Sequence, residues 1–286
     1  MHHLKFHTMA AAATAGLLLA ALPAAAQQRT APPKPAAARP AATSATAMPA
    51  RINGHPNLNG IWQAMNTANW DLQPHSASQG LVLEAGAQLA EPAGIGVVEG
   101  GEIPYLPAAL AKKQANHKDR QKLDPEVRCY LPGVPRATYR PFPFEIFQSA
   151  TYMAIAYEYD GAFRNIFLKD PGPAPIDTWM GQSYGKWEGD TLVVDVTGMD
   201  KRTWFDRAGD YHSDQLHVVE RYTMVSPTVI QYEATITDPE VYSRPWKISM
   251  PLYKHVEKNA QLLEFKCVEF VEDLMYGQFE KKKPTQ

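Results

Sequence analysis

The chain is short of three things: cysteine, net charge and long apolar runs. Its net charge of −2 offers no basic surface to the phosphates of nucleic acid. After residue 26, no apolar run reaches the roughly 20 residues that a membrane helix needs. These absences argue against nucleic acid as a partner and against a membrane span in the mature chain. The hydrophobic content of 45% is ample for the core of a globular domain.

The only cysteines are Cys129 and Cys267. Neither lies in a Cys-x-x-Cys motif or beside a cluster of histidines. In an oxidising compartment, two such cysteines are expected to form a disulfide. The bridge would close a long loop, for which chain entropy gives a stabilisation of about 5 kcal/mol at most. Two buried thiols or a metal-binding pair are the alternatives.

The first residues are typical of an export signal. Lys5 lies among three histidines in residues 1–7, and residues 10–26 are almost wholly alanine and leucine. The run ends in three alanines before Gln27, the small-residue pattern that a signal peptidase cleaves. It is short for a transmembrane anchor, lacks a basic stop-transfer flank, and is not followed by a cysteine for a lipid anchor. We predict that residues 1–26 are a cleaved signal peptide and that the protein is periplasmic or secreted.

The rest of the chain divides into a leader and a domain. Residues 27–51 are rich in alanine, proline, threonine and serine, and they lack the bulky apolar groups that would offset chain entropy. We expect them to be a disordered leader, followed by a single β domain over residues 52–286. The first part of this domain, up to residue 143, is irregular, with one helix expected to begin at Pro107.

From residue 144 onward, apolar and polar residues alternate in short segments separated by turn signals. Asp160-Gly161, for example, suits a tight hairpin. We therefore predict a mostly β fold, an antiparallel meander that closes into a barrel because closure removes exposed sheet edges. A sandwich is the alternative. The expected strands are residues 152–159, 163–168, 191–197, 216–225, 228–237, 246–252 and 262–270.

Gly60-Ile61-Trp62 resembles the Gly-x-Trp opening of lipocalins. The resemblance implies a calycin-like barrel in which Trp62 plugs the floor. The chain departs from that pattern in two ways. A long irregular stretch follows the first strand, and no arginine on the last strand is available to stack on Trp62.

A second resemblance covers more of the chain. The segments CYLPGVPR (residues 129–136), GKWEGDTLVVD (185–195) and HSDQLHVVER (212–221) look like those of a family of exported bacterial proteins of unassigned function. The likeness extends over residues 57–277. It implies a secreted setting and no particular reaction.

The first candidate catalytic residue is Glu220. By strand parity it lies on the same face as Val218 and Tyr222, which is the apolar face. A carboxylate inside a barrel is costly unless it is paired, and a buried one suits acid–base chemistry. Two alternatives remain: Glu220 pairs with an inward arginine, or the apolar face is the outer one.

A polar loop precedes that strand. It holds His212, which could act as a general base or a ligand, and Asp206, which could orient it. Glu220, His212 and Asp206 together give the alternative prediction of an enzyme, a lyase, isomerase or hydrolase. An ordered surface turn held by aspartate and serine side chains would need no function.

We predict no cofactor, with zinc as a minor alternative. His212, His217 and Glu220 are the residue types that bind zinc. However, His217 and Glu220 have opposite parity on one strand and should point to opposite faces. His212 could instead combine with the distant His75 or His117, although nothing in the spacing requires it.

Residues 181–185 spell Gly-x-Ser-x-Gly around Ser183. A nucleophile elbow needs a strand before the serine and a helix after it. A proline-rich stretch precedes this motif and a turn follows it, so we expect a loop whose glycines adopt unusual backbone angles.

Residues 135–144 combine two arginines with several aromatic residues, which suits the rim of a pocket for an anionic, partly apolar ligand. The segment could equally pack on the outside of the barrel. Our main prediction is a periplasmic barrel that binds an apolar or aromatic small molecule; a barrel filled with side chains is a further alternative. The sequence carries no sign of an oligomeric state. The expected ligand-binding residues are Arg136, Tyr139, Arg140, Trp179, Trp204 and Tyr222.

Overall fold

The computed structural model describes residues 47–80, 87 and 90–279. The predicted signal peptide (residues 1–26) and nearly all of the predicted leader (27–51) lie outside these ranges. Within them, no helix is both long enough and apolar enough to cross a membrane.

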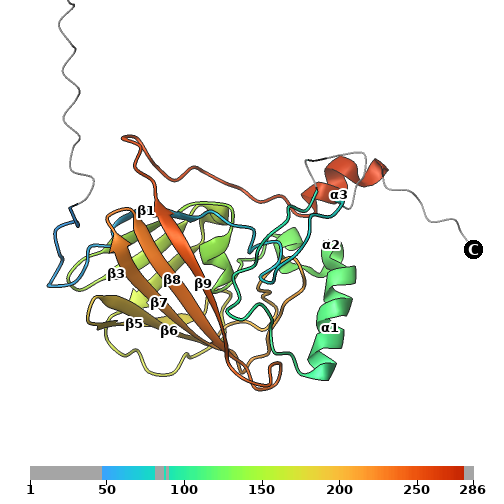
Figure 1. Ribbon diagram of the computed structural model, residues 1–286, viewed down its shortest axis with the longest axis horizontal. Coiled ribbons are helices and arrows are strands. Elements are labelled where there is room, and N and C mark those ends of the chain that lie inside the picture. The colour runs from blue at the N-terminus through green and yellow to red at the C-terminus, as the bar shows by residue number, and fades with distance from the viewer. Residues whose placement is uncertain (1–46, 81–86, 88–89, 280–286) are drawn as a thin grey trace, which may run out of the picture. The chain divides into compact units, whose positions relative to one another are not determined.

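Nine strands form one closed barrel in sequence order (Figure 1). Closure is achieved by β1, which pairs antiparallel with both β2 and β9. The predicted mostly β barrel is therefore confirmed. The strands are β1 Gly60–Ala64, β2 Phe144–Gln148, β3 Met153–Tyr157, β4 Phe163–Phe167, β5 Gln182–Glu188, β6 Thr191–Thr197, β7 His217–Ser226, β8 Val229–Thr237 and β9 Trp246–Lys254.

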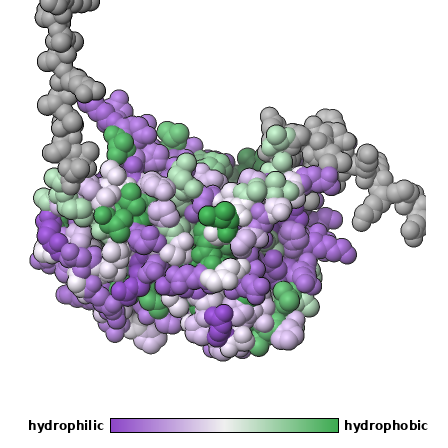
Figure 2. Space-filling model, in the orientation of Figure 1, coloured by the Kyte–Doolittle hydropathy of each residue, from purple (hydrophilic) through white to green (hydrophobic). Residues whose placement is uncertain are grey.

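The longest strands show why this sequence folds into a barrel. Along β7 and β8, buried side chains alternate with more exposed ones. The register places Tyr222 opposite Tyr232 and Glu220 opposite Ala234, so all four point inward. Most outer positions carry charged or polar groups; Val219, Val225 and Val229 are the exceptions. On the face drawn in Figure 2, apolar residues form separate patches among hydrophilic ones.

One neighbouring pair departs from the antiparallel meander. β4 and β5 run parallel and share two register pairs, Ile166 with Ser183 and Phe167 with Tyr184. The predicted loop at residues 181–185 is wrong, because Ser183 lies on β5. Gly185 permits the close approach, since a Cβ there would lie 2.6 Å from the Ile166 side chain.

The predicted last strand, residues 262–270, is also wrong. Pairing of β9 with β1 closes the barrel and leaves no edge for another strand. The chain after β9 instead runs away from the barrel to α3 (Val271–Tyr276) (Figure 1). We call residues 255–279 the strap. It ends in the short turn η5 (Gly277–Phe279).

The long irregular insertion between β1 and β2 contains the predicted helix, α1, which extends over Pro107–Lys118. Cys129 follows two further short helices and forms the predicted disulfide with Cys267 of the strap, with a Cα–Cα distance of 5.5 Å. The remaining helical segments are α2 Arg120–Leu123, η2 Pro125–Arg128, η3 Arg136–Tyr139 and η4 Tyr159–Gly161.

Trp62 is fully buried in the core. Its Nε1 donates a hydrogen bond of 2.9 Å to the carbonyl oxygen of Leu58. The cation beside its ring is Lys254 at the end of β9, with Nζ 5.3 Å from the ring centroid. The last strand thus supplies the cation that lies beside the Trp62 ring.

Candidate functional site

The barrel interior contains a buried ion pair. Glu220 on β7 pairs with Arg164 on β4, and both side chains are almost completely enclosed. The hydroxyls of Tyr222 and Tyr232 donate to the other Glu220 oxygen at 2.9 and 2.8 Å. Arg164 Nε donates to Ser183 Oγ at 2.7 Å. Of the possibilities that the sequence left open for Glu220, the structure shows the one in which it pairs with an inward arginine.

The charge on Arg164 is stabilised by its partner. Burial lowers the pKa of this guanidinium, but the carboxylate of Glu220 outweighs burial and holds the pKa well above its ordinary value. Three polar atoms inside the barrel have no hydrogen-bond partner among the described residues: Arg164 Nη1, Tyr157 Oη and Thr138 Oγ1. A catalytic role for Glu220 stays a prediction.

His212 is buried at the barrel end and does not contact Asp206. Its Nδ1 lies 2.7 Å from the Ser213 carbonyl oxygen, which can only accept, so Nδ1 carries the proton. Nε2 lies 2.6 Å from the Thr203 hydroxyl. Burial lowers the pKa of His212, so the ring is neutral near pH 7. The expectation that Asp206 orients His212 is therefore wrong.

Asp206 belongs to a different cluster, with Asp71 and Asp210. One oxygen from each lies within 4.8 Å of the others. Asp206 accepts hydrogen bonds from the backbone N–H groups of Leu72 and Asp210, at 2.9 and 3.1 Å. Burial, and then the charge of Asp210, raise the pKa of Asp206 well above its usual range. The cluster can share a proton or offer oxygen ligands to a hard cation.

The predicted zinc ligands do not converge. His217 lies on the outer side of β7, where Nε2 contacts Asp195 Oδ1 at 2.9 Å, whereas Glu220 points inward. The two nitrogens of His212 are both engaged, as described above. Within the described ranges, the three aspartates are the only group of carboxylates, histidines or cysteines close enough to share an ion.

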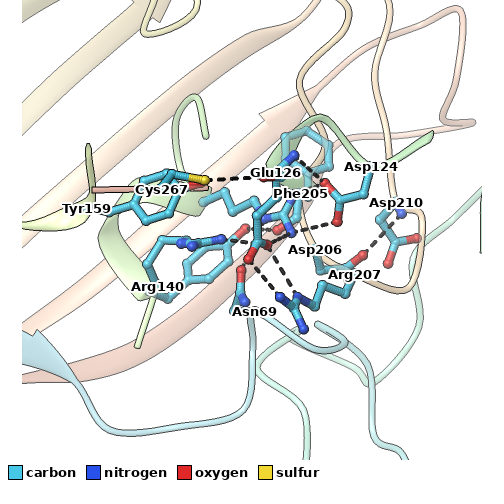
Figure 3. A network of polar contacts seen from close by, with 12 residues as sticks. Asn69, Asp124, Glu126, Arg140, Tyr159, Phe205, Asp206, Arg207, Asp210 and Cys267 are labelled. Atoms are coloured by element: carbon cyan, nitrogen blue, oxygen red, sulfur yellow. Dashed lines mark hydrogen bonds and ion pairs between the residues drawn. The ribbon is translucent and has the colours of Figure 1, made fainter. Parts of the chain in front are cut away.

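Three arginines converge on Glu126 of η2 (Figure 3). Arg136 is buried and donates to both oxygens of Asp124 at 2.9 Å and to Glu126 Oε2 at 2.6 Å. Arg207 donates to Glu126 Oε1 at 2.8 Å. Burial raises the pKa of Glu126, but the charges of Arg140, Arg207 and Arg136 outweigh it and hold the pKa well below its usual range. Glu126 is therefore ionised.

The third arginine, Arg140, is held differently. Only 3% of it is exposed, yet no hydrogen bond joins its guanidinium to any described residue. Its Nη1 lies 2.5 Å from Glu126 Oε2 without hydrogen-bond geometry, and its Cζ lies 3.9 Å from the centroid of the Tyr159 ring. Burial lowers the pKa of Arg140, and Glu126 opposes that shift.

Arg140 lines a cavity of about 650 Å³ between the strap and the insertion. We call it the strap cavity. The disulfide at Cys267 forms part of its wall. Aromatic and cationic side chains line it together with the acidic residues Glu126, Glu272 and Asp273. The aromatic residues are Trp70, Phe142, Tyr159, Phe265 and Phe270, and the cations are Lys122, Arg140, Arg207 and Lys266.

A second, more open cavity of about 440 Å³ lies at the parallel contact of β4 and β5. Trp179, Phe163 and Ile176 line it, and Arg164 and Ser183 contribute to the lining as well. Trp179 also stacks on Tyr130, with a centroid distance of 4.5 Å.

The residues predicted to bind a ligand do not form one site. Arg140 lines the strap cavity, Trp179 lines the second cavity, and Tyr222 lies inside the barrel. The other three are packed in the core, where for example the Tyr139 hydroxyl donates to the Phe205 carbonyl at 2.7 Å. These three residues are Arg136, Tyr139 and Trp204.

Sequence reasoning missed most of the aromatic wall. The sequence does not reveal Phe265 as a site residue because its segment alternates like a strand. It does not reveal Tyr159 because that residue lies at the end of a predicted strand. The one available signal was the pair Cys129 and Cys267, since a disulfide brings the strap to the insertion. The site is thus defined by its own geometry: no protein-family model, no curated protein and no solved structure matches this chain.

Proposed function

We propose that this protein binds an apolar or aromatic small molecule in the strap cavity. The observation that supports this most is the cavity itself. Its volume of about 650 Å³ falls within the range typical of small-molecule sites, roughly 300–1,000 Å³. Five aromatic residues and three valines contribute to its lining, and apolar and aromatic side chains are typical of such sites.

Three rings form a compact aromatic surface in the cavity. Phe142 and Phe265 have centroids 4.5 Å apart, and Tyr159 lies 5.3 Å from Phe265 and 5.7 Å from Phe142. Trp70 contributes a further ring, which is covered by the Arg207 guanidinium at 4.6 Å. Such rings offer flat apolar area at a low entropic cost, because each has few rotatable bonds.

The strap wall is tied down at several points. The disulfide fixes Cys267, Phe270 N donates to the Val127 carbonyl at 2.7 Å, and Glu272 pairs with Arg207 at 3.3 Å. A wall fixed before the ligand arrives lowers the ordering cost of binding. This supports a binding site that is largely formed in the free protein.

The barrel interior is less suited to a ligand. Large side chains fill it, among them Trp62, Phe144, Tyr222 and Tyr232, together with the pair of Arg164 and Glu220. We therefore assign the binding function to the strap cavity, and not to the inside of the barrel as expected from the lipocalin resemblance.

The setting that we propose is periplasmic or extracellular. Disulfides persist in oxidising compartments and are rare in the cytosol. The disulfide between Cys129 and Cys267 supports such a compartment, in agreement with the export signal predicted at residues 1–26.

The acid–base enzyme has weaker support. Glu220 is neutralised by Arg164 and hydrogen-bonded to two tyrosines, and His212 uses both ring nitrogens within the protein. Neither has a spare position directed at a substrate.

The proposal is tested with a neutral apolar dye, N-phenyl-1-naphthylamine, whose fluorescence rises on entering an apolar site. We expect saturable binding to the purified protein. Phe265→Ala should weaken dye binding about tenfold, because it removes one aromatic contact with the dye. Phe163→Ala, in the second cavity, is the matched control and should leave it unchanged. Absence of saturable binding, or loss of it in Phe163→Ala alone, would overturn the proposal.

A further inference from the structure

Arg140 differs from the other buried arginines because both its Nε and its Nη1 lack a hydrogen-bond partner among the described residues, although Nη1 forms an ion pair with Glu126. A guanidinium carries five N–H groups, and a buried donor without a partner costs about 1–3 kcal/mol. Among the residues that the structure describes, none accepts a hydrogen bond from Arg140, although the side chain is only 3% exposed. Arg140 is one of the residues that line the strap cavity, so a molecule bound there would lie beside it.

The neighbouring carboxylate cannot satisfy Arg140 in full. Glu126 Oε2 already accepts from Arg136 at 2.6 Å and from Arg207 Nε at 3.3 Å, and Oε1 accepts from Arg207 Nη2 at 2.8 Å. Around this point, the buried guanidinium groups of Arg136 and Arg140 and the partly exposed one of Arg207 surround the carboxylates of Glu126 and Asp124. Two further carboxylates, Glu272 and Asp273, line the cavity nearer the surface, and Glu272 pairs with Arg207.

The orientation of Arg140 is fixed by Tyr159, whose ring lies 3.9 Å from the guanidinium carbon. Stacking of this kind holds the plane of the guanidinium and leaves its N–H edge for an acceptor. The same Tyr159 ring packs against Phe265 and Phe142. The cation and the apolar surface of the strap cavity are therefore adjacent.

From this juxtaposition we infer that the ligand is an aromatic or apolar carboxylate, with its carboxylate on Arg140 and its apolar part against Phe142, Tyr159 and Phe265. The inference rests on the proposed function. A planar carboxylate matches the planar fork of a guanidinium and would supply the hydrogen bonds that Glu126 does not.

The test uses calorimetry with three probes that share one ring system: 2-naphthoate, the neutral 2-naphthamide and 2-naphthyl phosphate. We expect the wild-type protein to bind 2-naphthoate at least about tenfold more tightly than 2-naphthamide. The difference comes from the charge-assisted hydrogen bond that only the carboxylate forms with Arg140. Equal affinities for 2-naphthoate and 2-naphthamide would overturn the inference that the ligand is a carboxylate, while leaving the proposed function intact. Preference for the phosphate would replace the carboxylate by a phosphate ester, and binding of none of the probes would overturn both proposals.

Two variants of Arg140 assign the preference to this residue. Arg140→Met keeps an unbranched apolar stem, removes the guanidinium, and should bind 2-naphthoate and 2-naphthamide equally. Arg140→Lys keeps the charge without the fork and should retain only part of the preference. Lys122→Met, which removes an exposed cation from the same cavity, should keep it in full.

Circular dichroism and thermal unfolding of each variant establish that the fold is intact. If Arg140→Met does not fold, the comparison of Arg140→Lys with Lys122→Met still decides the question. A full preference in Arg140→Lys, or an equal loss in Lys122→Met, would show that net charge alone is recognised and would overturn the role of Arg140.

Discussion

The barrel interior and the strap cavity each bury an arginine against a glutamate, and the two arginines are used differently. Arg164 donates hydrogen bonds from Nε and Nη2 to Ser183 and Glu220, and only its Nη1 lacks a partner among the described residues. Arg140 lies beside Glu126 without a hydrogen bond to any part of the chain that the structure describes. A buried arginine whose donors are used stabilises the fold, whereas one that faces a cavity with donors unused is available to a ligand.

The two regions also differ in how they are held. Continuous strand register surrounds the barrel interior on every side. The outer wall of the strap cavity depends on one disulfide and a few polar and aromatic contacts. Regions with few buried contacts open at a lower free energy than a closed sheet does. The following predictions test this contrast, beginning with the largest expected effect.

Glu220→Gln should lower the free energy of unfolding by about 3–5 kcal/mol, because it leaves the buried charge of Arg164 without a counter-ion. Urea denaturation measures the change. Glu233→Gln is the matched control on the outer face of β8, where Glu233 pairs with Lys247, and it should cost about 1 kcal/mol or less. A similar small cost at both positions would remove the contrast between the barrel interior and the surface.

Replacing both cysteines by serine should lower the free energy of unfolding by about 2–4 kcal/mol. The effect on local dynamics should be confined to the strap. In hydrogen exchange, amides of residues 255–279 should exchange faster in the double variant than in the wild type. Amides at the centres of β7 and β8 should remain the slowest to exchange. Equal acceleration of strap and barrel would mean that the two regions open together.

His212 should make stability depend on pH. Burial lowers the pKa of its imidazole in the folded state, so the unfolded chain binds the proton more tightly. Stability is therefore complete above the unfolded pKa, near 6.5, and falls as the pH decreases below it. The slope for one proton is about 1.4 kcal/mol per pH unit at most. Urea denaturation between pH 7.5 and 5 should show a shallower slope for His212→Gln than for the wild type; identical slopes would contradict the assignment.

The smallest expected effect is that of Asp71→Asn. Burial is the main cause that raises the pKa of Asp71, and Asp210 adds to it, so the ionised carboxylate is unfavourable in the folded state. The penalty is present above the raised pKa and vanishes as the pH falls to the unfolded value. Asp71→Asn should therefore gain about 0.5 kcal/mol at pH 7 and nothing near pH 3.5. If 1 mM CaCl₂ stabilises the wild type more than it stabilises Asp71→Asn, the three aspartates bind a cation. Cation binding, and not the repulsion between Asp71 and Asp210, would then dominate at this cluster.

The sequence was sufficient for those strands whose alternation is long and uninterrupted. Residues 228–237 and 191–197 were predicted within a residue of β8 and β6, and the parity of β7 correctly placed Glu220 inside. β5 was missed because Gly181 and Gly185 resemble loop residues, although Gly185 serves a close contact with Ile166. The strap was mistaken for a strand because only closure of the barrel, which is a non-local event, removes its partner.

The candidate site was predictable in part. Arg140 stands in a segment in which cations and aromatic residues are adjacent. That local signal allowed either the rim of a pocket or packing outside the barrel, and Arg140 lines the strap cavity. The identical signal at Arg136 led to a different outcome, because Asp124 and Glu126 neutralise it in the core. Which of two neighbouring arginines meets a carboxylate depends on residues that only the folded chain brings together.

The position of Cys267 after β9 has a consequence for when the protein becomes able to bind. The strap is synthesised after every strand of the barrel, and its link to Cys129 needs an oxidant that the chain itself does not carry. A completed barrel in a reducing environment would still lack a fixed wall for the cavity. If the strap cavity binds a ligand as proposed, binding competence would arise as the last step of maturation, and only where thiols are oxidised.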